Sequence, residues 1–302
     1  MGEGGRSAVV TVTYNSERVI EGFLRSLLQQ SYENFVLYVI DNASTDHTLE
    51  ILAACKDRRI VIIPNQCNVG VACGNNQGIR AGLEAHCDSV LLINNDTEFR
   101  SELLKSLRGG LCDYKCDMAV PKISYYSEPR KIWYAGGHFD RWKGYMGVHE
   151  GLDETDRDQF EQSRQVEYAP TCCMLIRREA FNKVGLMDEQ YFVYADDTDF
   201  CFRALRNGLK LFYLPTTTLL HKVSSLTGAE DSKFTSRHLT RSHIYFIRKN
   251  LGLWRSACYL PAFQIKLFYK LLSRVVDWDG FLVREKAFLE GWKIPIPEEV
   301  TS

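Results

Sequence analysis

The stretch Ser89–Thr97 constrains the fold of this chain more than any other segment. Residues 90–93 are Val-Leu-Leu-Ile, and this apolar run ends abruptly in the polar residues 94–96. A short, continuous apolar run with polar ends is typical of a strand that is buried on both faces of a sheet. Open α/β sheets bind ligands beyond the carboxyl ends of their strands, so Asp96 is a candidate ligand-binding carboxylate. The alternative is an ordinary turn, or the cap of a helix that starts near Ser101.

The first hundred residues alternate between strand and helix patterns. Strand patterns occupy 8–13, 35–40, 60–63 and 90–93, and helical patterns lie between them at 19–28, 46–54 and 70–83. This alternation predicts βαβ units and a parallel sheet with right-handed crossovers. Ser16 is placed to cap the first helix.

The rest of the chain is less regular up to about residue 228. Further strands are predicted at 118–123, 169–177 and 210–214, and a helix at about 196–208. Between them lie a segment rich in glycine and aromatic residues, 133–148, and a charged loop, 153–167.

Composition excludes several classes of protein. The chain has 302 residues, of which 45% are hydrophobic and 25% charged, as in an ordinary globular protein of one large or two smaller domains. Its ten cysteines form no C-x-x-C pair that would indicate a zinc site. The N-terminus has no apolar signal segment and no apolar run is long enough to cross a membrane, so we expect a reduced, cytoplasmic setting.

The segment 237–276 carries eight Lys and Arg residues, no Asp or Glu, and many Leu and aromatic residues. This pattern is typical of helices that lie on an anionic membrane surface, here the inner face of the cell membrane. Helices packed on the catalytic domain with a solvated basic face, or a contact in a homodimer, are the alternatives. Nucleic acid is disfavoured because no base-reading motif accompanies the charge.

Polar residues follow the predicted strands in a fixed order. They are Thr13-Tyr14-Asn15, then Asp41, then a loop with Asn68, Gly70 and Asn75, then Asn94-Asn95-Asp96, and finally Asp196-Asp197 with His221 beyond. From about residue 8 to 228, this ordered set resembles glycosyltransferase family 2, the inverting enzymes of the GT-A fold, and in particular its rhamnosyltransferase-like branch.

The resemblance implies an α/β protein with a Rossmann-like, mostly parallel central sheet flanked by helices. It implies a catalytic domain over 1–228, with a nucleotide-binding half at 1–100 and an acceptor-binding half at 101–228. Residues 229–302 would form a basic, amphipathic helical extension.

The resemblance also implies a metal site. Departure of a nucleoside diphosphate leaves negative charge on its β-phosphate, which a divalent cation with oxygen ligands can offset. In the family the acidic motif is commonly Asp-x-Asp, but its first position here is Asn94. Asp96 is therefore the main expected ligand for Mg²⁺ or Mn²⁺, with His221 as the second; a histidine that follows a strand is otherwise more often structural.

For the nucleotide, the resemblance assigns Asp41 to the ring N–H of uracil or thymine, while its alternative role is to cap the turn that follows. Donor contacts are further implied for eight residues: Thr13, Tyr14, Asn15, Asn68, Gly70, Asn75, Asn94 and Asn95.

For the acceptor, the family's Glu-Asp motif implies that Asp197 is the general base and that Asp196 contacts the acceptor. An inverting transfer needs such a base on the side of the sugar opposite the leaving group. The alternative is that these carboxylates only start a helix favourably. Aromatic side chains in 133–148 either stack on sugar rings or seal a small core.

The sequence thus predicts an inverting glycosyltransferase of cell-surface polysaccharide synthesis. The expected donor is a UDP- or dTDP-sugar, with dTDP-rhamnose the best single guess, and the expected acceptor is a hydroxyl of a saccharide or lipid-linked molecule. The alternatives are a nucleotidyltransferase on the same half-fold and a non-catalytic nucleotide-sugar-binding subunit, the latter favoured by Asn94.

Overall fold

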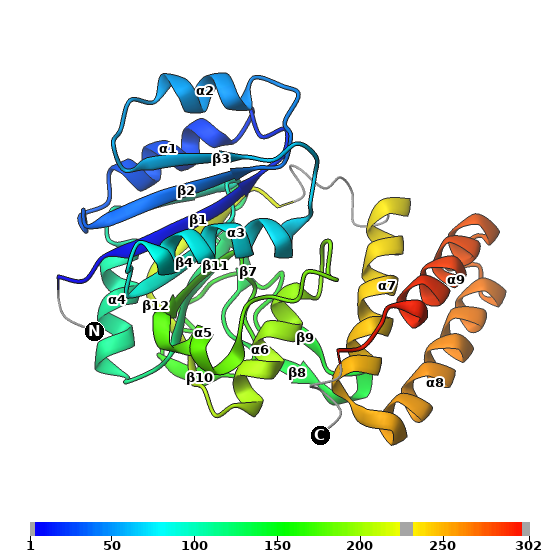
Figure 1. Ribbon diagram of the computed structural model, residues 1–302. Coiled ribbons are helices and arrows are strands. Elements are labelled where there is room, and N and C mark those ends of the chain that lie inside the picture. The colour runs from blue at the N-terminus through cyan, green and yellow to red at the C-terminus, as the bar shows by residue number, and fades with distance from the viewer. Residues whose placement is uncertain (1–3, 224–231, 298–302) are drawn as a thin grey trace.

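A computed structural model describes residues 4–223 and 232–297, and Figure 1 shows its arrangement. The predicted alternation of the first hundred residues is confirmed. Its elements are β1 (Ser7–Thr13), α1 (Ile20–Leu28), β2 (Phe35–Asp41), α2 (Thr48–Ala54), β3 (Ile60–Pro64), α3 (Val71–Glu84) and β4 (Ser89–Ile93). Helices α1 and α2 lie on one side of these strands and α3 on the other, as right-handed crossovers require when the chain reverses direction across the sheet.

The second part of the chain extends the same sheet. It contributes β5 (Thr97–Phe99), α4 (Leu103–Asp113), β6 (Met118–Tyr125), β7 (Ile132–Tyr134), β10 (Arg164–Val166), β11 (Cys173–Arg177), α5 (Arg178–Val184), α6 (Asp196–Arg206) and β12 (Leu211–His221). A separate hairpin is formed by β8 (Gly137–Asp140) and β9 (Met146–His149), which are joined by the short 3₁₀ helix η1 (Arg141–Lys143).

The main path of the sheet has the order β10-β12-β6-β11-β4-β1-β2-β3, with β5 and β7 paired at its side. Within this sheet the pairs made by β5, β7, β10 and β11 are antiparallel and the others parallel, so six of the eight strands on the main path run in the same direction: β12, β6, β4, β1, β2 and β3. The central sheet is therefore mostly parallel and flanked by helices, as predicted. Every residue of β2 and of β4 is buried, because helices cover both faces of the sheet.

Two local expectations are wrong. The Ser16 hydroxyl does not cap α1 but accepts a hydrogen bond from the Tyr14 N–H, at 3.2 Å. The charged segment 153–167 is not wholly a loop, because its end forms β10 on the edge of β12.

The C-terminal part forms three helices, α7 (Lys233–Asn250), α8 (Gly252–Leu272) and α9 (Trp278–Lys293), beside the sheet (Figure 1). The expected boundary between 228 and 229 lies outside the described residues. Within the described ranges, no helix is long and apolar enough to cross a membrane.

Helix α7 is fixed to the body of the protein by a buried ion-pair network. The Lys249 ammonium lies 2.7 Å from the Asp188 carboxylate and 2.7 Å from Asp199, which is on α6. Asp199 also accepts hydrogen bonds from Arg203 and Asn250, at 2.7 Å and 2.9 Å. Because a buried carboxylate needs such partners, Asp199 holds α6 and α7 together.

Candidate active site

The polar residues predicted to follow the strands meet at one edge of the sheet. Strand β1 lies between β2 and β4 and is parallel to both, so the carboxyl ends of the three strands are adjacent. Thr13 pairs directly with Asp41 across β1 and β2. The segment 94–96 follows β4 at the same edge.

The carboxylate of Asp41 is fully buried and is held by neighbouring donors. It accepts hydrogen bonds from the Thr13 hydroxyl at 2.8 Å, the Ser44 N–H at 2.9 Å and the Ser44 hydroxyl at 2.6 Å. Asp41 therefore does cap the turn that follows β2. A carboxylate offers about four acceptor positions, so these three bonds leave one for a ligand.

The loops after β1, β2 and β3 are linked to one another by side chains. The Asn15 amide oxygen accepts from the Thr45 N–H at 2.8 Å, with Asn15 in the left-handed region at φ 51°. Tyr14 beside it is exposed. The Asn42 amide donates to the Asn68 side-chain oxygen at 3.2 Å, and that oxygen also accepts from the Gly70 N–H.

Gly70 begins α3 in a conformation that favours glycine, with φ 85° and ψ 174°. A Cβ there would lie 2.6 Å from the Phe192 carbonyl oxygen, which itself accepts from the Val71 N–H. The start of α3 is thus packed against the segment that leads into α6. Asn75, one turn into α3, is buried.

The residues after β4 have different environments. Asn94 is exposed, whereas Asn95 and Asp96 are buried. The Asn95 amide donates to the Val12 carbonyl, which joins this turn to β1. Thr97 opens β5 and pairs with His221 of β12, so the backbone places His221 beside Asp96.

Asp96 and His221 form the candidate metal site. The Asp96 Oδ1 and His221 Nε2 atoms are 3.2 Å apart, and both side chains are 8% exposed. The His221 Nδ1 is buried without a hydrogen-bond partner. Burial opposes the charged imidazole, but the adjacent Cys172 and the Asp96 carboxylate outweigh it and raise the pKa of His221 to about 10.

This pair fits a hard divalent cation. Magnesium sites commonly use one or two protein carboxylates and take their remaining ligands from substrate phosphates and water. Because His221 must be neutral to coordinate a cation, binding would displace its proton.

One other group of acidic residues in the described part of the chain has the spacing of a metal site: Asp156, Asp158 and Glu161. The Lys122 ammonium contacts both Asp156 and Glu161, so a protein cation already occupies this cluster. We therefore do not assign it a metal.

Asp196 and Asp197 open α6 after two residues in the left-handed region, Tyr194 and Ala195. Burial and the neighbouring Asp197 carboxylate raise the pKa of Asp196 to about 8. Burial also raises the pKa of Asp197, opposed by hydrogen bonds from Tyr168 and Thr198. The Asp196 Oδ2 is buried without a hydrogen-bond partner, whereas the Asp197 Oδ2 accepts from the Tyr168 hydroxyl at 3.0 Å.

A row of aromatic rings joins Asp197 to the metal pair. Tyr168 stacks on His149 with ring centroids 5.8 Å apart, His149 meets the edge of Trp133 at 4.5 Å, and Trp133 meets His221 at 4.6 Å. The two predicted carboxylate sites are thus connected through three successive ring contacts.

Tyr168 and His149 had no signal in the sequence, since neither belongs to a motif. Among the aromatic residues of 133–148, Tyr134 and Phe139 seal a core, Trp133 borders the site, and Trp142 is exposed.

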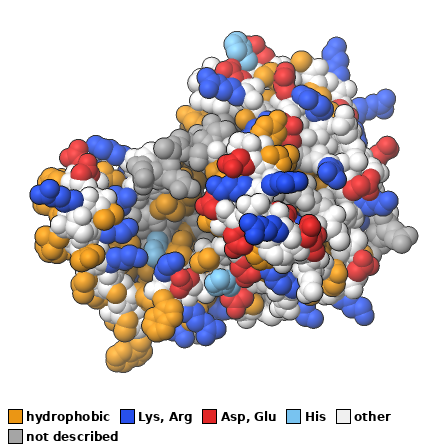
Figure 2. All heavy atoms as spheres, turned by 180° about the vertical axis from the view of Figure 1, so that it is seen from behind, with side chains coloured by type: hydrophobic (Ala, Val, Ile, Leu, Met, Phe, Trp, Pro, Cys, Tyr) orange, Lys and Arg blue, Asp and Glu red, His pale blue; other side chains and the backbone are white. Residues whose placement is uncertain are grey.

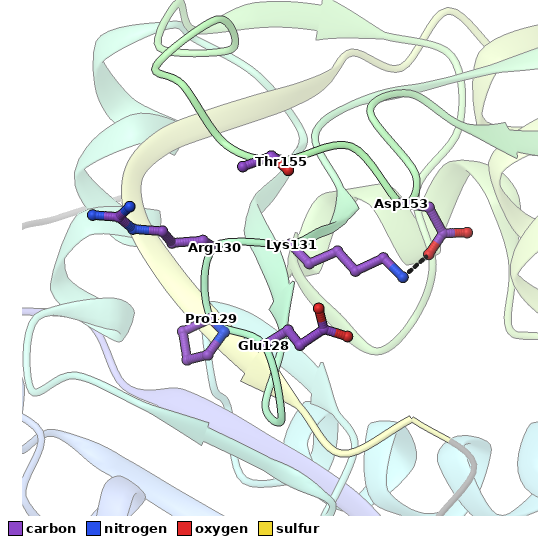
Figure 3. Close-up of a pocket in the computed structure, with 6 residues that line it drawn as sticks. All are labelled: Glu128, Pro129, Arg130, Lys131, Asp153 and Thr155. Atoms are coloured by element: carbon purple, nitrogen blue, oxygen red, sulfur yellow. Dashed lines mark ion pairs between the residues drawn. The ribbon is translucent and has the colours of Figure 1, made fainter.

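A cavity of about 460 Å³ adjoins His221 and is also lined by Tyr126, Lys131 and Lys222. A second cavity of about 300 Å³ shares Lys131 and Glu128 with it. Figure 3 shows Lys131 reaching toward Asp153, with which it forms an ion pair of 2.9 Å, while Arg130 points away. Lys131 and Lys222 therefore lie near the Asp96–His221 pair, each already in an ion pair, with Asp153 and Glu98 respectively.

Solved structures with this architecture are GT-A glycosyltransferases. S. aureus TarS in complex with UDP-GlcNAc superposes with a TM-score of 0.62 at 18% identity, covering 98% of this chain and 82% of that one. GalNAc-T7 with UDP, GalNAc and Mn²⁺ gives a TM-score of 0.65 at 14% identity; 96% of this chain is covered but only 56% of that chain, little more than half its length.

Residues 8–185, more than half of the chain, match Glycosyl transferase family 2, and the chain belongs to this family. The N-acetylglucosaminyl-diphospho-decaprenol L-rhamnosyltransferase of Mycobacterium tuberculosis is 26% identical over 265 residues, covering 82% of this chain and 86% of that protein. The dTDP-rhamnosyl transferase RfbF of Shigella flexneri is 25% identical, with 71% and 68% covered. The protein is a rhamnosyltransferase-like glycosyltransferase of glycan synthesis.

The close contact at Gly70 can be tested against a matched glycine. Gly185 has nearly the same backbone conformation, φ 76° and ψ −167°, but a Cβ there would meet nothing within 4 Å. Gly185→Ala should cost about 1 kcal/mol of unfolding free energy from backbone strain alone. Gly70→Ala should cost about 2–4 kcal/mol, because the contact with Phe192 adds to the same strain. Denaturant unfolding of both variants gives the comparison; equal losses would contradict the packing of α3 against residue 192.

Proposed function

We propose that this enzyme transfers a sugar, with inversion, from a UDP- or dTDP-sugar to a hydroxyl of a saccharide or lipid-linked acceptor. The observation that supports this most is the aromatic row that joins the Asp96–His221 pair to Asp197. Its three ring contacts link the leaving-group site and the base site that a direct displacement would need in one active site. The best single guess for the donor is dTDP-rhamnose, in keeping with the name of the Shigella relative.

The nucleotide would occupy the loops after β1, β2 and β3. Asp41 has one acceptor position left for the ring N–H of uracil or thymine. Thr13, Tyr14 and Asn15 would border the base and ribose. Asn68, Gly70 and Asn75 would border the ribose and phosphates, where the start of α3 presents backbone N–H groups. Asn94 and Asn95 would contribute amide groups beside the metal pair.

Asp96 and His221 would hold Mg²⁺ or Mn²⁺, as the paired oxygen and nitrogen donors suit such an ion. When bound, the cation supplies positive charge next to the departing diphosphate. Lys131 and Lys222 line the adjoining cavity, where each forms an ion pair within the chain, Lys131 with Asp153 and Lys222 with Glu98.

Asp197 would take the proton of the acceptor hydroxyl. A base is most effective when its pKa approaches the working pH, and burial moves the pKa of Asp197 in that direction. Asp196, whose pKa is raised to about 8, would stay largely protonated at neutral pH and donate its proton in a hydrogen bond to the acceptor.

The acceptor class is proposed from the Mycobacterium relative, whose name specifies a diphospho-decaprenol. A lipid-linked acceptor requires the enzyme at a membrane, so we place the protein in the cytoplasm, in peripheral contact with the inner face through the basic region 237–276. A homodimer contact by this region is the alternative.

The proposed function is tested first by donor hydrolysis across UDP-, dTDP-, GDP- and CDP-sugars, each with Mn²⁺ and with chelator. One uracil or thymine donor should be hydrolysed slowly, and chelation should reduce the rate. Asp96→Asn should weaken the response to Mn²⁺, whereas Asp158→Asn, in the acidic cluster that Lys122 occupies, should not. Binding of a donor without any turnover, with or without an acceptor, would favour the non-catalytic subunit that Asn94 suggests.

Replacement of the base is the second test. Asp197→Asn should lower kcat for transfer by roughly 10²- to 10⁴-fold, since the amide cannot accept the acceptor proton. Donor affinity, measured by calorimetry on the same preparation, should change little. Near-normal transfer by this variant would remove Asp197 from the role.

The hydrogen bond from Tyr168 gives a prediction about pH. This bond lowers the pKa of Asp197, so Tyr168→Phe should raise it. Because the base must be ionised, the acidic limb of the pH–rate profile should then move to higher pH. Tyr134→Phe is the matched control, since its equally buried hydroxyl donates to the Tyr168 carbonyl and not to a carboxylate. A limb that stays in place in Tyr168→Phe, or moves equally in both, would contradict the positioning of Asp197 by Tyr168.

A further inference from the structure

The outer face of α8 is an exposed apolar stripe. Its first turn exposes Leu253 by 84% and Trp254 by 87%. From Trp254 the stripe continues at spacings of three and four residues, which one face of a helix requires. Its further members are Cys258, Pro261, Ile265, Phe268 and Leu272, with Tyr269 beside them, and all are exposed.

The opposite face of α8 is apolar too. Leu260 and Leu267 are buried there, and Phe263 packs against the core. In a helix that is apolar on both faces, one face packs against the protein and the other is left for a second apolar environment. Single exposed apolar residues need no explanation, but a stripe of five turns does.

The charges that α8 itself places beside this stripe are all positive. Arg255, Lys266 and Lys270 fall along one edge of it by helical spacing, and Arg274 follows in the next turn. No acidic residue occurs between 237 and 276. Helix α9 adds a second exposed stripe, made of Trp278, Leu282, Leu289 and Trp292.

Helix α7 does not present a comparable exposed apolar stripe. Its residues Ile244–Ile247 are buried, and Lys249 is used by the ion pairs with Asp188 and Asp199. Most of the exposed large apolar residues of 237–276 therefore lie on α8, and the exposed apolar surface continues beyond 276 into α9.

The tip of the β8–β9 hairpin lies next to the start of α8. The Tyr259 hydroxyl donates to the Arg141 carbonyl, and the Arg255 guanidinium lies 5.4 Å from the centre of the Tyr145 ring. Trp142, at this tip, is 94% exposed. Figure 2 shows apolar side chains gathered on the outer edge and lower end of the helical lobe.

We propose that the outer faces of α8 and α9, together with Trp142, lie in the headgroup layer of an anionic membrane. This inference deepens the proposed function, on which it rests for the presence of a lipid-linked acceptor. Tryptophan prefers the boundary between headgroups and acyl chains, and lysine and arginine attract anionic headgroups. Three of the protein's five tryptophans lie on these faces of α8 and α9.

A second copy of the chain is the competing occupant. The α8 edge of that copy would carry the same positive charges, and α8 has no acidic residue to pair with them. The three acidic residues of α9 already have partners within the chain: Asp279 with Lys233, Glu290 with Arg237 and Glu285 with Gln264. An anionic lipid surface complements both the apolar stripe and its basic edge, so the observations favour lipid.

The test is flotation of the full-length protein with vesicles of phosphatidylcholine alone or with phosphatidylglycerol added. The wild-type protein should bind the anionic vesicles more strongly, with a blue shift of its tryptophan emission. Trp254→Gln/Ile265→Gln/Leu272→Gln should lower the partition coefficient by roughly tenfold or more per residue that inserts. Lys266→Gln/Lys270→Gln should weaken binding to anionic vesicles only, again by roughly tenfold.

Controls separate surface chemistry from folding and from catalysis. Arg25→Gln/Lys105→Gln removes the same charge from exposed positions on α1 and α4 and should leave vesicle binding unchanged. Donor hydrolysis without vesicles and the thermal unfolding midpoint should be unchanged in every variant. A protein that binds vesicles but hydrolyses no donor would contradict the proposed function and leave this inference standing.

Three results would overturn the inference: no binding of the wild-type protein to anionic vesicles, equal binding by the Gln triple variant, or a solution dimer that this variant dissociates in the absence of vesicle binding. The last result would assign the stripe to a second copy.

Discussion

The parallel pairing of β1 with β2 on one side and with β4 on the other sets the position of the proposed donor-binding groups that follow these three strands. The pairing brings Thr13 opposite Asp41 and carries 94–96 to the same edge. Asn95 then donates to the Val12 carbonyl, so the turn after β4 is attached to β1 by its side chain as well. Apolar residues buried on both faces of the sheet hold β2 and β4 in place. The polar residues that come after these strands therefore stay close together.

The second half of the site depends on pairings over much longer sequence distances. β12 returns to pair with β5, which sets His221 beside Asp96 although 125 positions separate them. On the acceptor side, buried carboxylates decide the geometry. Asp199 is matched by donors from Arg203, Lys249 and Asn250, whereas burial raises the pKa of both Asp196 and Asp197. One helix therefore carries a carboxylate held in a structural network and two whose pKa is raised.

Much of this could be predicted from sequence because the signals are local. An apolar run that stops at Asn94, or a helical pattern after Ser16, is determined by neighbouring residues, and β1 to β4 lie where these patterns predict. The contact of Tyr168 with Asp197 could not be predicted, since it depends on how the segment between β10 and β11 lies against α6. The same holds for the side chain of Ser16, which the sequence suggests as a helix cap but which accepts a hydrogen bond from the Tyr14 N–H. It also holds for β10, which lies in a charged segment and pairs with the distant strand β12. The two roles predicted for Asp41, capping the turn and accepting from the base N–H, are compatible, because the cap leaves one acceptor position of the carboxylate for a ligand.

The β8–β9 hairpin has a geometric consequence for the choice of acceptor. Its tip carries Trp142 next to α8, and its other end carries His149 against Trp133 and Tyr168. Four residues of β9 span roughly 13 Å, about the length of two sugar rings. With the tip at a lipid surface, the reacting centre would stand at a fixed height above it. The length of the hairpin would then bear on how far the terminal hydroxyl of a lipid-linked acceptor must project from the bilayer.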